Sequence, residues 1–452
     1  MRLQDGSCGR TEGPAMCQQR RLGRPGHGLL GLIAALALVG PAGRVAAEPL
    51  TEQISLSNPW PSVQELLQLP EWMQLELSVT AEPLFNPWGG ERSAGSWIQQ
   101  GTLNLDLSSG LNKPSANWHE LDHWQLSVAV NHVAGDAYYS SAIGALFPLQ
   151  QAAYPAGFYL SEVAIERQRG EGWLNVKAGI LPINPEFVEV PVFDNYVHSA
   201  FNNTLNITVA GLPINPYPAL GGVVSAHASP ELSLRYGLFD LSSTDTISQW
   251  LGLADSGFGL NSGVAQFLQL DFQPRAMSAQ PLPACRTERG IVRWNQRRGA
   301  CAAPVSVDNQ LPDGLISLGG FLTSENGNGV YGSVTLPTGV PLGLADRLWL
   351  GASYAPDASR VIAPTFVGGG LLVQGPLPGR PLDVALLGLG RGGLSNQLSS
   401  SAYEGMLELG YRIQINQSLN LQPTLQWIFN PSGTLKTVPG ILAAGMQIQL
   451  AF

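Results

Sequence analysis

The chain ends in Met446-Gln-Ile-Gln-Leu-Ala-Phe452, a stretch in which positions 446, 448, 450 and 452 are apolar. Because successive side chains of a β-strand point to opposite faces, this alternation places the four large apolar side chains on one face. The same period recurs upstream, in residues 73–79, 102–108, 124–130, 232–236, 268–273 and 407–415. The pattern predicts an all-β protein built from strands with one apolar and one polar face.

Turn-forming residues separate these strands, and no helical pattern lies between them, which argues against a parallel α/β sheet. Gly supplies 53 and Pro 34 of the 452 residues. One short helix is expected over residues 62–69, ended by Pro70. If the strands close into a barrel, this helix is expected near the barrel mouth or in its lumen. We therefore expect one β domain, residues 73–452, preceded by an N-terminal segment, residues 48–72.

The low charge of the chain bears on which way the apolar faces point. Only 13% of the residues are charged, whereas a soluble surface carries roughly 25–35%. A soluble β-sandwich turns its apolar faces inward, and an outer-membrane barrel turns them toward lipid. Aromatic residues near strand ends suit the interfacial girdles of a barrel: Trp124, Tyr236, Tyr354, Tyr411 and Trp427.

A terminal amphipathic strand closing on Phe452 also resembles the signal read by the outer-membrane barrel assembly machinery. We therefore predict a transmembrane antiparallel β-barrel of the outer-membrane type. The chain length fits 16 strands of 9–11 residues with their loops, and 18 strands are compatible with it as well.

The first 47 residues have the pattern of a secretory signal peptide. Basic residues 20, 21 and 24 precede an apolar run over 29–39, and Val45-Ala-Ala47 supplies small residues before a cleavage site. The run is too short to span a bilayer as a helix, and both Met1 and Met16 are compatible with its start. We expect export to the bacterial outer membrane.

Residues 1–47 hold six arginines, Asp5 and Glu12, so the remaining chain has 18 basic and 31 acidic residues, a net charge of −13. This balance argues against nucleic acid as a partner. Cys8 and Cys17 leave with the signal peptide, and in an exported chain Cys285 and Cys301 are expected to form a disulfide rather than a metal site.

A basic loop coincides with the predicted disulfide. It contains five of the 18 remaining basic residues: Arg286, Arg289, Arg293, Arg297 and Arg298. Because long connections of these barrels are extracellular, we expect the loop at the outer mouth. There it would attract anionic solutes or surface glycans, or form a solvated lid bound to other loops or to lipopolysaccharide.

Three further stretches stand out: Phe85-Asn-Pro-Trp-Gly-Gly90, the block 158–187, and Leu419-Asn-Leu-Gln-Pro-Thr-Leu-Gln-Trp-Ile-Phe-Asn-Pro431. They resemble the carbohydrate-selective porin family of the OprB type. The resemblance implies a 16-stranded outer-membrane barrel that passes sugars and other small solutes by diffusion, with no catalytic residues and no cofactor. Outer-membrane lipid and the barrel assembly machinery are then expected partners, and general porin architecture suggests a homotrimer. Residues 275–312 depart from the family pattern.

Polar faces of the predicted strands supply candidates for the pore wall. Their mixed charges suggest a broad, weakly selective channel, in which some of them merely solvate the wall. The candidates are Glu76, Asp106, Lys177, Arg235, Asp271, Glu408, Arg412 and Gln414. The competing functions are a general or anion-preferring porin and, in another class, a secreted sugar-binding β-sandwich or a glycosidase built on one.

Two motif matches are rejected on context. His119-Glu-Leu-Asp-His123 fits the zincin pattern, but an alternating strand begins at once after it and leaves no room for the required helix. We interpret it as a polar turn, with weak zinc binding left open. Gly388-Leu-Gly-Arg-Gly-Gly393 fits a dinucleotide fingerprint, but no helix follows. We interpret that stretch as a glycine-rich loop or turn.

Overall fold

A computed structural model gives the fold of most of the chain. The signal-peptide segment, residues 119–122 of the zincin-like motif, Arg297 and Arg298 lie outside the described residues. The described residues are 52–54, 56–109, 123–169, 173–202, 208, 212–251, 262–274, 281–294, 301–325 and 327–452.

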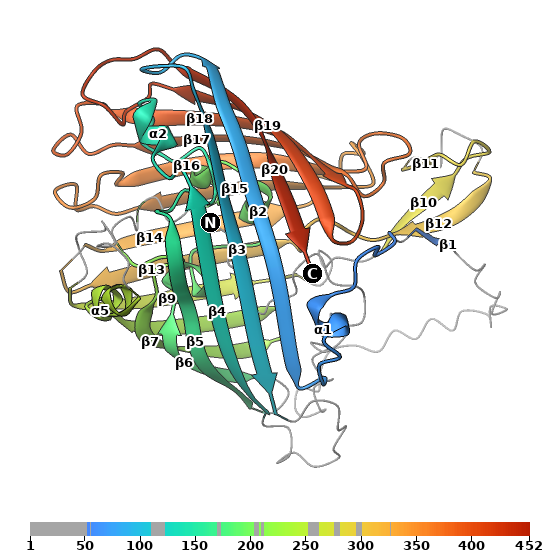
Figure 1. Cartoon of the computed structure of the whole chain (residues 1–452), viewed down its shortest axis with the longest axis horizontal. Coiled ribbons are helices and arrows are strands. Elements are labelled where there is room, and N and C mark those ends of the chain that lie inside the picture. Colours follow the sequence, from blue (N-terminus) through green and yellow to red (C-terminus); the bar gives the residue numbers. More distant parts are fainter. Residues whose placement is uncertain are drawn as a thin grey trace, which may run out of the picture.

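Sixteen antiparallel strands close into one barrel, which confirms the predicted fold class (Figure 1). The closed ring excludes the alternative sandwich and the alternative count of 18. The barrel strands are β2 (Met73–Trp88), β3 (Ala94–Ser108), β4 (His123–Gly135), β5 (Gly157–Arg169), β6 (Leu174–Leu181), β7 (Ala219–Ser229), β8 (Leu232–Asp240), β9 (Val264–Phe272), β13 (Leu315–Thr323), β14 (Gly329–Leu336), β15 (Ala345–Tyr354), β16 (Thr365–Gln374), β17 (Val384–Gly393), β18 (Tyr403–Gln414), β19 (Leu419–Phe429) and β20 (Ile441–Ala451).

Two pairings complete the ring. The last strand β20 pairs with the first barrel strand β2, with Gln449 opposite Thr80. Strand β9 pairs directly with β13, with Phe267 opposite Phe321, so the ring takes no strand from the residues between them. Every strand predicted from alternation coincides with part of a barrel strand, and three of them run one residue past its end. Among the described residues, no helix is long and apolar enough to cross a membrane.

The outward positions carry the apolar side chains. Leu103, Leu350 and Leu389 are typical, with 42–56% of each exposed. We call the end where β2 begins and β20 stops the terminal end, and the opposite end the loop end. Exposed aromatic side chains lie near both: Trp88, Trp97, Phe158, Tyr354, Trp427 and Phe429 toward the loop end, and Trp124, Trp173 and Phe272 toward the terminal end. Tyr236, expected in such a girdle, is instead at the middle of β8.

Connection length orients the barrel. Residues 230–231 and 415–418 are short turns at the terminal end, whereas residues 136–156, 182–218 and 241–263 are long connections at the loop end. Helix α5 (Ser243–Trp250) belongs to the last of these. Because outer-membrane barrels have short periplasmic turns and longer extracellular loops, the terminal end faces the periplasm.

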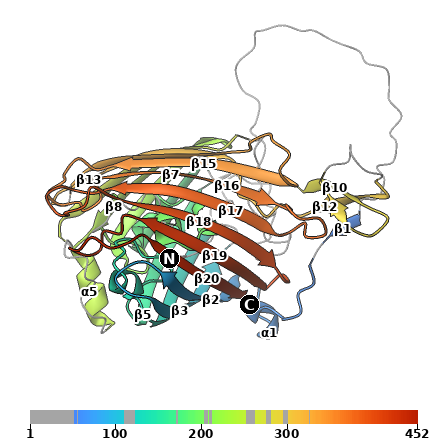
Figure 2. The ribbon, with the colours of Figure 1, turned by 90° about the horizontal axis from the view of Figure 1, so that it is seen from above.

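The insert between β9 and β13 forms a small sheet at the terminal end. Strands β10 (Leu282–Arg286), β11 (Val292–Arg293) and β12 (Ala303–Val307) are joined by β1 (Glu52–Ile54), which pairs in parallel with β12. Both views place this sheet beyond the barrel end that carries the C-terminus (Figures 1 and 2). The basic loop therefore lies at the terminal end, which connection length assigns to the periplasm, and not among the long connections of the loop end. The length rule treats every long connection as extracellular, but this one is a folded unit on the periplasmic side.

The N-terminal segment lies along the same end. Helix α1 (Val63–Leu66) is closed by a capping box between Ser62 and Glu65. The side chain of Gln64, just inside the helix, accepts a hydrogen bond from the Leu75 backbone N–H of β2 at 3.2 Å. Trp60 packs near Phe452 with ring centroids 6.4 Å apart. The segment is thus fixed beside the periplasmic mouth.

Two long connections fold into the barrel. The first inner segment is residues 136–156, with helix α2 (Tyr139–Ala142); the second is residues 182–202, with α3 (Ile183–Glu186), the 3-10 helix η3 (Phe193–Asn195) and α4 (Ser199–Asn202). Their apolar side chains and inward residues of the wall form the main buried core. Trp349 of β15 is at its centre, with ring centroids 5.2 Å from Phe193 and 5.7 Å from Tyr196.

Inward glycines of β16 and β17 make room for the second inner segment. A Cβ atom at Gly370 would lie 2.2 Å from the Tyr196 hydroxyl oxygen, and one at Gly388 would lie 2.8 Å from the Tyr196 ring. The stretch 388–393 that we interpreted as a loop or turn is therefore part of strand β17. Its glycines alternate with outward side chains because the inner face there is covered by packed loop residues.

Candidate functional site: the barrel lumen

The inward side of β2, β3 and β4 is polar and half-exposed over the half of each strand near the terminal end. We call these side chains the polar wall. Six of the eight are uncharged hydrogen-bonding groups and two are acidic. They are Gln74, Glu76, Ser78, Thr80, Asn104, Asp106, Gln125 and Ser127.

Cross-strand pairing arranges the polar wall in rows. Gln74 is opposite Asp106, which in turn is opposite Ser127, and Glu76 is opposite Asn104. The Asp106 carboxylate accepts hydrogen bonds from Gln125 Nε2 at 2.9 Å and Ser127 Oγ at 2.5 Å. Donors and acceptors therefore lie at every second residue of three neighbouring strands, which suits a solute with many hydroxyl groups.

The opposite side of the lumen holds the inner segments. Gln426 Nε2 of β19 donates to the Leu149 carbonyl at 3.0 Å, and Gln422 Nε2 donates to the Asn195 carbonyl at 2.7 Å. Trp349 Nε1 donates to the Tyr196 hydroxyl at 2.7 Å. The two segments also contact each other, since Ser199 donates from both its N–H and its hydroxyl to the Pro148 carbonyl.

A neutral histidine lies at the junction of the two segments. His198 is fully buried, and its Nδ1 accepts a hydrogen bond from the Ala200 N–H at 3.1 Å. Burial lowers the pKa of His198 to about 3, because the low-dielectric interior disfavours the charged imidazolium. The His198 imidazole is therefore neutral at neutral pH.

Most of the charged pore-wall candidates are engaged by the protein itself. Lys177 pairs with Glu162 at 2.9 Å and with Glu186 of the second inner segment at 2.6 Å. Arg235 pairs with Asp271 at 2.5 Å. Among the described residues, Arg235 and Asp271 are the only two of the eight candidates that form an ion pair with each other.

The remaining candidates divide by their positions. Arg412 donates to Asn195 Oδ1 at 2.9 Å and to the Gln310 carbonyl, so it links the second inner segment to the chain after β12. Gln414 bonds to the Asn416 carbonyl in a periplasmic turn. Glu408 is buried against the second inner segment. Glu76 and Asp106 are half-exposed on the polar wall. The lumen thus presents fewer charges than the mixed-sign pattern suggested.

Several wall residues escaped the sequence reasoning. Asn420, Gln422, Thr424 and Gln426 alternate with apolar residues in β19, so period two was sufficient to mark them as inward. Glu404 lies two inward positions before Glu408 on β18 and was missed because the predicted strand began at residue 407. Glu82 of β2, which accepts from the Ala152 N–H at 3.0 Å, had no distinguishing signal.

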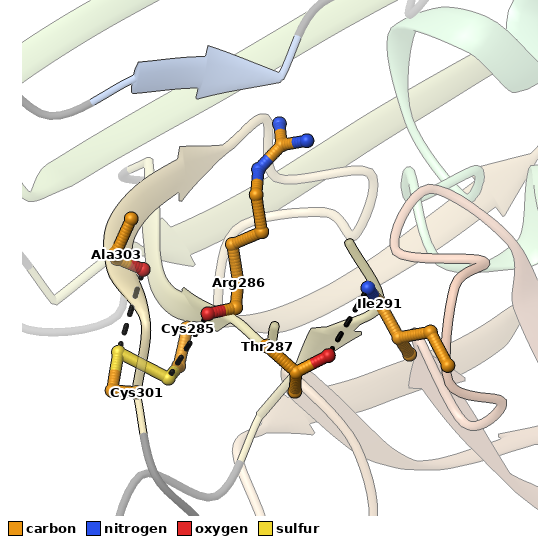
Figure 3. Close-up of a disulfide and its surroundings, with 6 residues drawn as sticks. All are labelled: Cys285, Arg286, Thr287, Ile291, Cys301 and Ala303. Atoms are coloured by element: carbon orange, nitrogen blue, oxygen red, sulfur yellow. Dashed lines mark hydrogen bonds between the residues drawn. A yellow bond between two sulfur atoms is a disulfide. The ribbon is translucent and has the colours of Figure 1, made fainter. Parts of the chain in front are cut away.

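The basic loop is pinned as the cysteine count suggested. Cys285 of β10 and Cys301 form a disulfide with a Cα–Cα distance of 5.2 Å (Figure 3). Arg286 of the same strand pairs with Glu52 of β1 at 2.6 Å, and Arg289 and Arg293 are exposed. The disulfide and the ion pair therefore hold together a sheet assembled from the N-terminus and the insert.

No cluster of three or more potential metal ligands occurs among the described residues. His123, the last residue of the zincin-like motif, begins strand β4. The last residue of the motif thus lies in a barrel strand and not in the helix that a zincin site requires.

A sequence profile described as carbohydrate-selective porin, OprB family, matches residues 115–341 and 345–452. The chain belongs to this family. The match takes in most of the barrel strands and also runs through the insert that departs from the expected pattern. Membership makes the molecule a porin, and with the barrel fold it implies an outer-membrane location.

Solved structures of Pseudomonas putida OprB share the fold of this OprB-family chain. The high-pH structure is 16% identical with a TM-score of 0.64, and covers 86% of this chain and 96% of its own. The low-pH structure is 14% identical with a TM-score of 0.50, and covers 88% and 100%. No curated protein sequence matches the chain.

Proposed function

We propose that this porin is a passive diffusion channel for small uncharged sugars, and that the polar wall is the surface along which they pass. The observation that carries the proposal is the composition of that wall, where six of eight half-exposed side chains are uncharged hydrogen-bonding groups. A sugar that loses water at a constriction can exchange those hydrogen bonds for bonds to such groups. The family description supports the same solute class.

The charge arrangement supports a preference against anions. Lys177, Arg235 and Arg412 are bonded to protein groups, whereas the two charged members of the polar wall, Glu76 and Asp106, are acidic. A ring of one charge sign would instead select ions. A general porin, which sorts solutes by size alone, is the second candidate. Membership in a channel family supports a transport role rather than an enzymatic one.

Export and assembly complete the proposal. The pattern of residues 1–47 supports a cleaved signal peptide, and the β20 sequence ending at Phe452 supports recognition by the barrel assembly machinery. A homotrimer is proposed from general porin architecture alone. Chemical crosslinking of the protein in native outer membranes tests the trimer.

The deciding experiment measures solute entry into liposomes that contain the purified, refolded protein. Uncharged mono- and disaccharides are compared with amino acids, cations and anions of similar size. Faster entry of sugars than of size-matched charged solutes supports the proposal. Entry ordered by size alone supports the general porin, and preferred entry of anions contradicts both the proposal and the assignment of the polar wall.

A further inference from the structure

Strand β18 carries two fully buried carboxylates on its lumen face, Glu404 and Glu408. They are two inward positions apart, which corresponds to ~13 Å along the strand. A buried carboxylate is costly unless its oxygens are hydrogen-bonded. The partners of these two carboxylates therefore indicate what they are for.

Glu404 binds the first inner segment. Its Oε1 accepts from the Phe147 N–H at 2.9 Å, and both of its oxygens are within 3.1 Å of the Leu146 N–H. Its Oε2 also accepts from the Ser432 N–H of the β19–β20 connection at 2.6 Å. One carboxylate thus collects three backbone donors from two connections of the loop end.

Glu408 binds the second inner segment in the same way. Its Oε1 accepts from the Val197 N–H and its Oε2 from the His198 N–H, both at 2.9 Å. The Thr424 hydroxyl of the neighbouring strand donates to Oε1 at 3.1 Å. Each carboxylate therefore holds two consecutive backbone N–H groups of one inner segment.

We propose that Glu404 and Glu408 are positioning residues that set the size limit of the channel by holding the two inner segments in the lumen. The inference rests on the proposed function, because it assigns the limit of that same channel. Neither side chain contacts a passing solute, since both are fully buried. They act through the segments, which are also joined to each other between Ser199 and Pro148.

The chemistry of the two sites requires carboxylates rather than amides. In each, both side-chain oxygens face donors, and an amide would turn its own NH2 group toward one of them. Each of the two side chains also accepts at least three hydrogen bonds. By contrast, Gln422 and Gln426 each supply one neutral bond to a segment carbonyl. The carboxylates are therefore the stronger anchors.

The test compares E408Q, E404Q and the double variant E404A/E408A with the wild-type protein in planar bilayers and in liposomes. D346N is the matched control, because it removes one buried carboxylate of a barrel strand that accepts from the Thr338 N–H of a terminal-end turn instead of from an inner segment. Migration of unheated samples in SDS gels reports separately whether each barrel is folded. If the double variant does not fold, the single amide variants carry the test.

We expect graded behaviour among folded variants. Single-channel conductance in KCl and entry of trisaccharides rise from wild type to E408Q and E404Q and further to the double variant, with frequent transitions between conductance levels. D346N leaves both the conductance and the size limit as in the wild type. Unchanged conductance and size limit in folded variants overturn the inference. If the wild-type channel conducts KCl but excludes sugars, the proposed function is wrong. The role of Glu404 and Glu408 is still tested in that case, because the conductance of the variants shows whether the inner segments are held in the lumen.

Discussion

Tyr196 and Trp349 are 153 positions apart in the sequence, yet the Trp349 indole Nε1 donates to the Tyr196 hydroxyl at 2.7 Å. The same hydroxyl lies 2.9 Å from the Leu387 carbonyl, to which it donates. One side chain of the second inner segment thus bridges strands β15 and β17 inside the barrel. The two hydrogen bonds therefore fix the second inner segment, which partly fills the lumen, to two strands of the barrel wall.

Replacing Tyr196 by Phe removes both of these hydrogen bonds while keeping the ring. We expect Y196F to lower stability by about 1–3 kcal/mol, because the buried indole N–H is left without its acceptor. The measurement is the temperature at which the folded form is lost in SDS gels. Y354F is the control, since Tyr354 is 51% exposed on the outer face. An equal decrease in both variants would count against the bridge.

Gly370 tests how closely the second inner segment approaches the wall. An added Cβ would lie 2.2 Å from the Tyr196 hydroxyl oxygen and 2.5 Å from the Leu387 carbonyl oxygen. We expect G370A to destabilise the barrel by about 1–3 kcal/mol through overcrowding. G101A is the matched control, because a Cβ at Gly101 meets no atom within 4 Å. Equal thermal stability of the two variants would contradict the packing.

The periplasmic position of the basic sheet leads to a topology prediction. An epitope inserted after Gly290, an exposed glycine with open space around it, is expected to be hidden from antibody on intact cells. An epitope inserted after Lys436, exposed in the β19–β20 connection, is expected to be accessible. After the outer membrane is permeabilised, antibody should bind both. Antibody binding to the epitope at position 290 on intact cells would show that the barrel has the opposite orientation in the membrane.

Period-two alternation is enough to predict the barrel, because lipid on one side and lumen on the other impose opposite polarity on neighbouring residues. The same reasoning predicted Glu408 and Arg412 as inward residues, and β18 places both on the lumen side, bonded to the second inner segment. Alternation within a strand does not indicate which residues meet across the barrel. Nothing in the sequence indicates that Glu408 meets Val197, which is 211 positions away.

The errors have a common physical origin. The glycine stretch 388–393 was interpreted as a loop or turn, and the region from Cys285 to Cys301 as a basic loop, both from local composition. In the structure, Gly388, Gly390 and Gly392 form an inner strand face against Tyr196, Phe201 and Phe147. The insert forms a sheet of β10, β11 and β12, to which β1 from the N-terminus adds a fourth strand. Long-range partners decide the structure of such segments, so composition and spacing within them are insufficient.

His198 gives the channel an acid-sensitive contribution to stability. Its pKa is about 3 in the folded protein and about 6.5 in an unfolded chain. Between these values the unfolded chain binds a proton that the folded protein does not, so stability falls as pH decreases from 6.5 toward 3. The slope from this residue approaches about 1.4 kcal/mol per pH unit. Above pH 6.5 the contribution is constant.

We expect H198N to flatten this dependence, because asparagine keeps a side-chain acceptor for the Ala200 N–H but does not titrate in this range. The measurement is the thermal midpoint of folded wild-type and variant protein at pH 7, 5 and 4, taken as the difference between the two so that other acidic groups cancel. H132N, at an exposed position of β4, is the control. Parallel curves for wild type and H198N would show that His198 is protonated within the folded barrel at acidic pH, and that its burial does not keep it neutral.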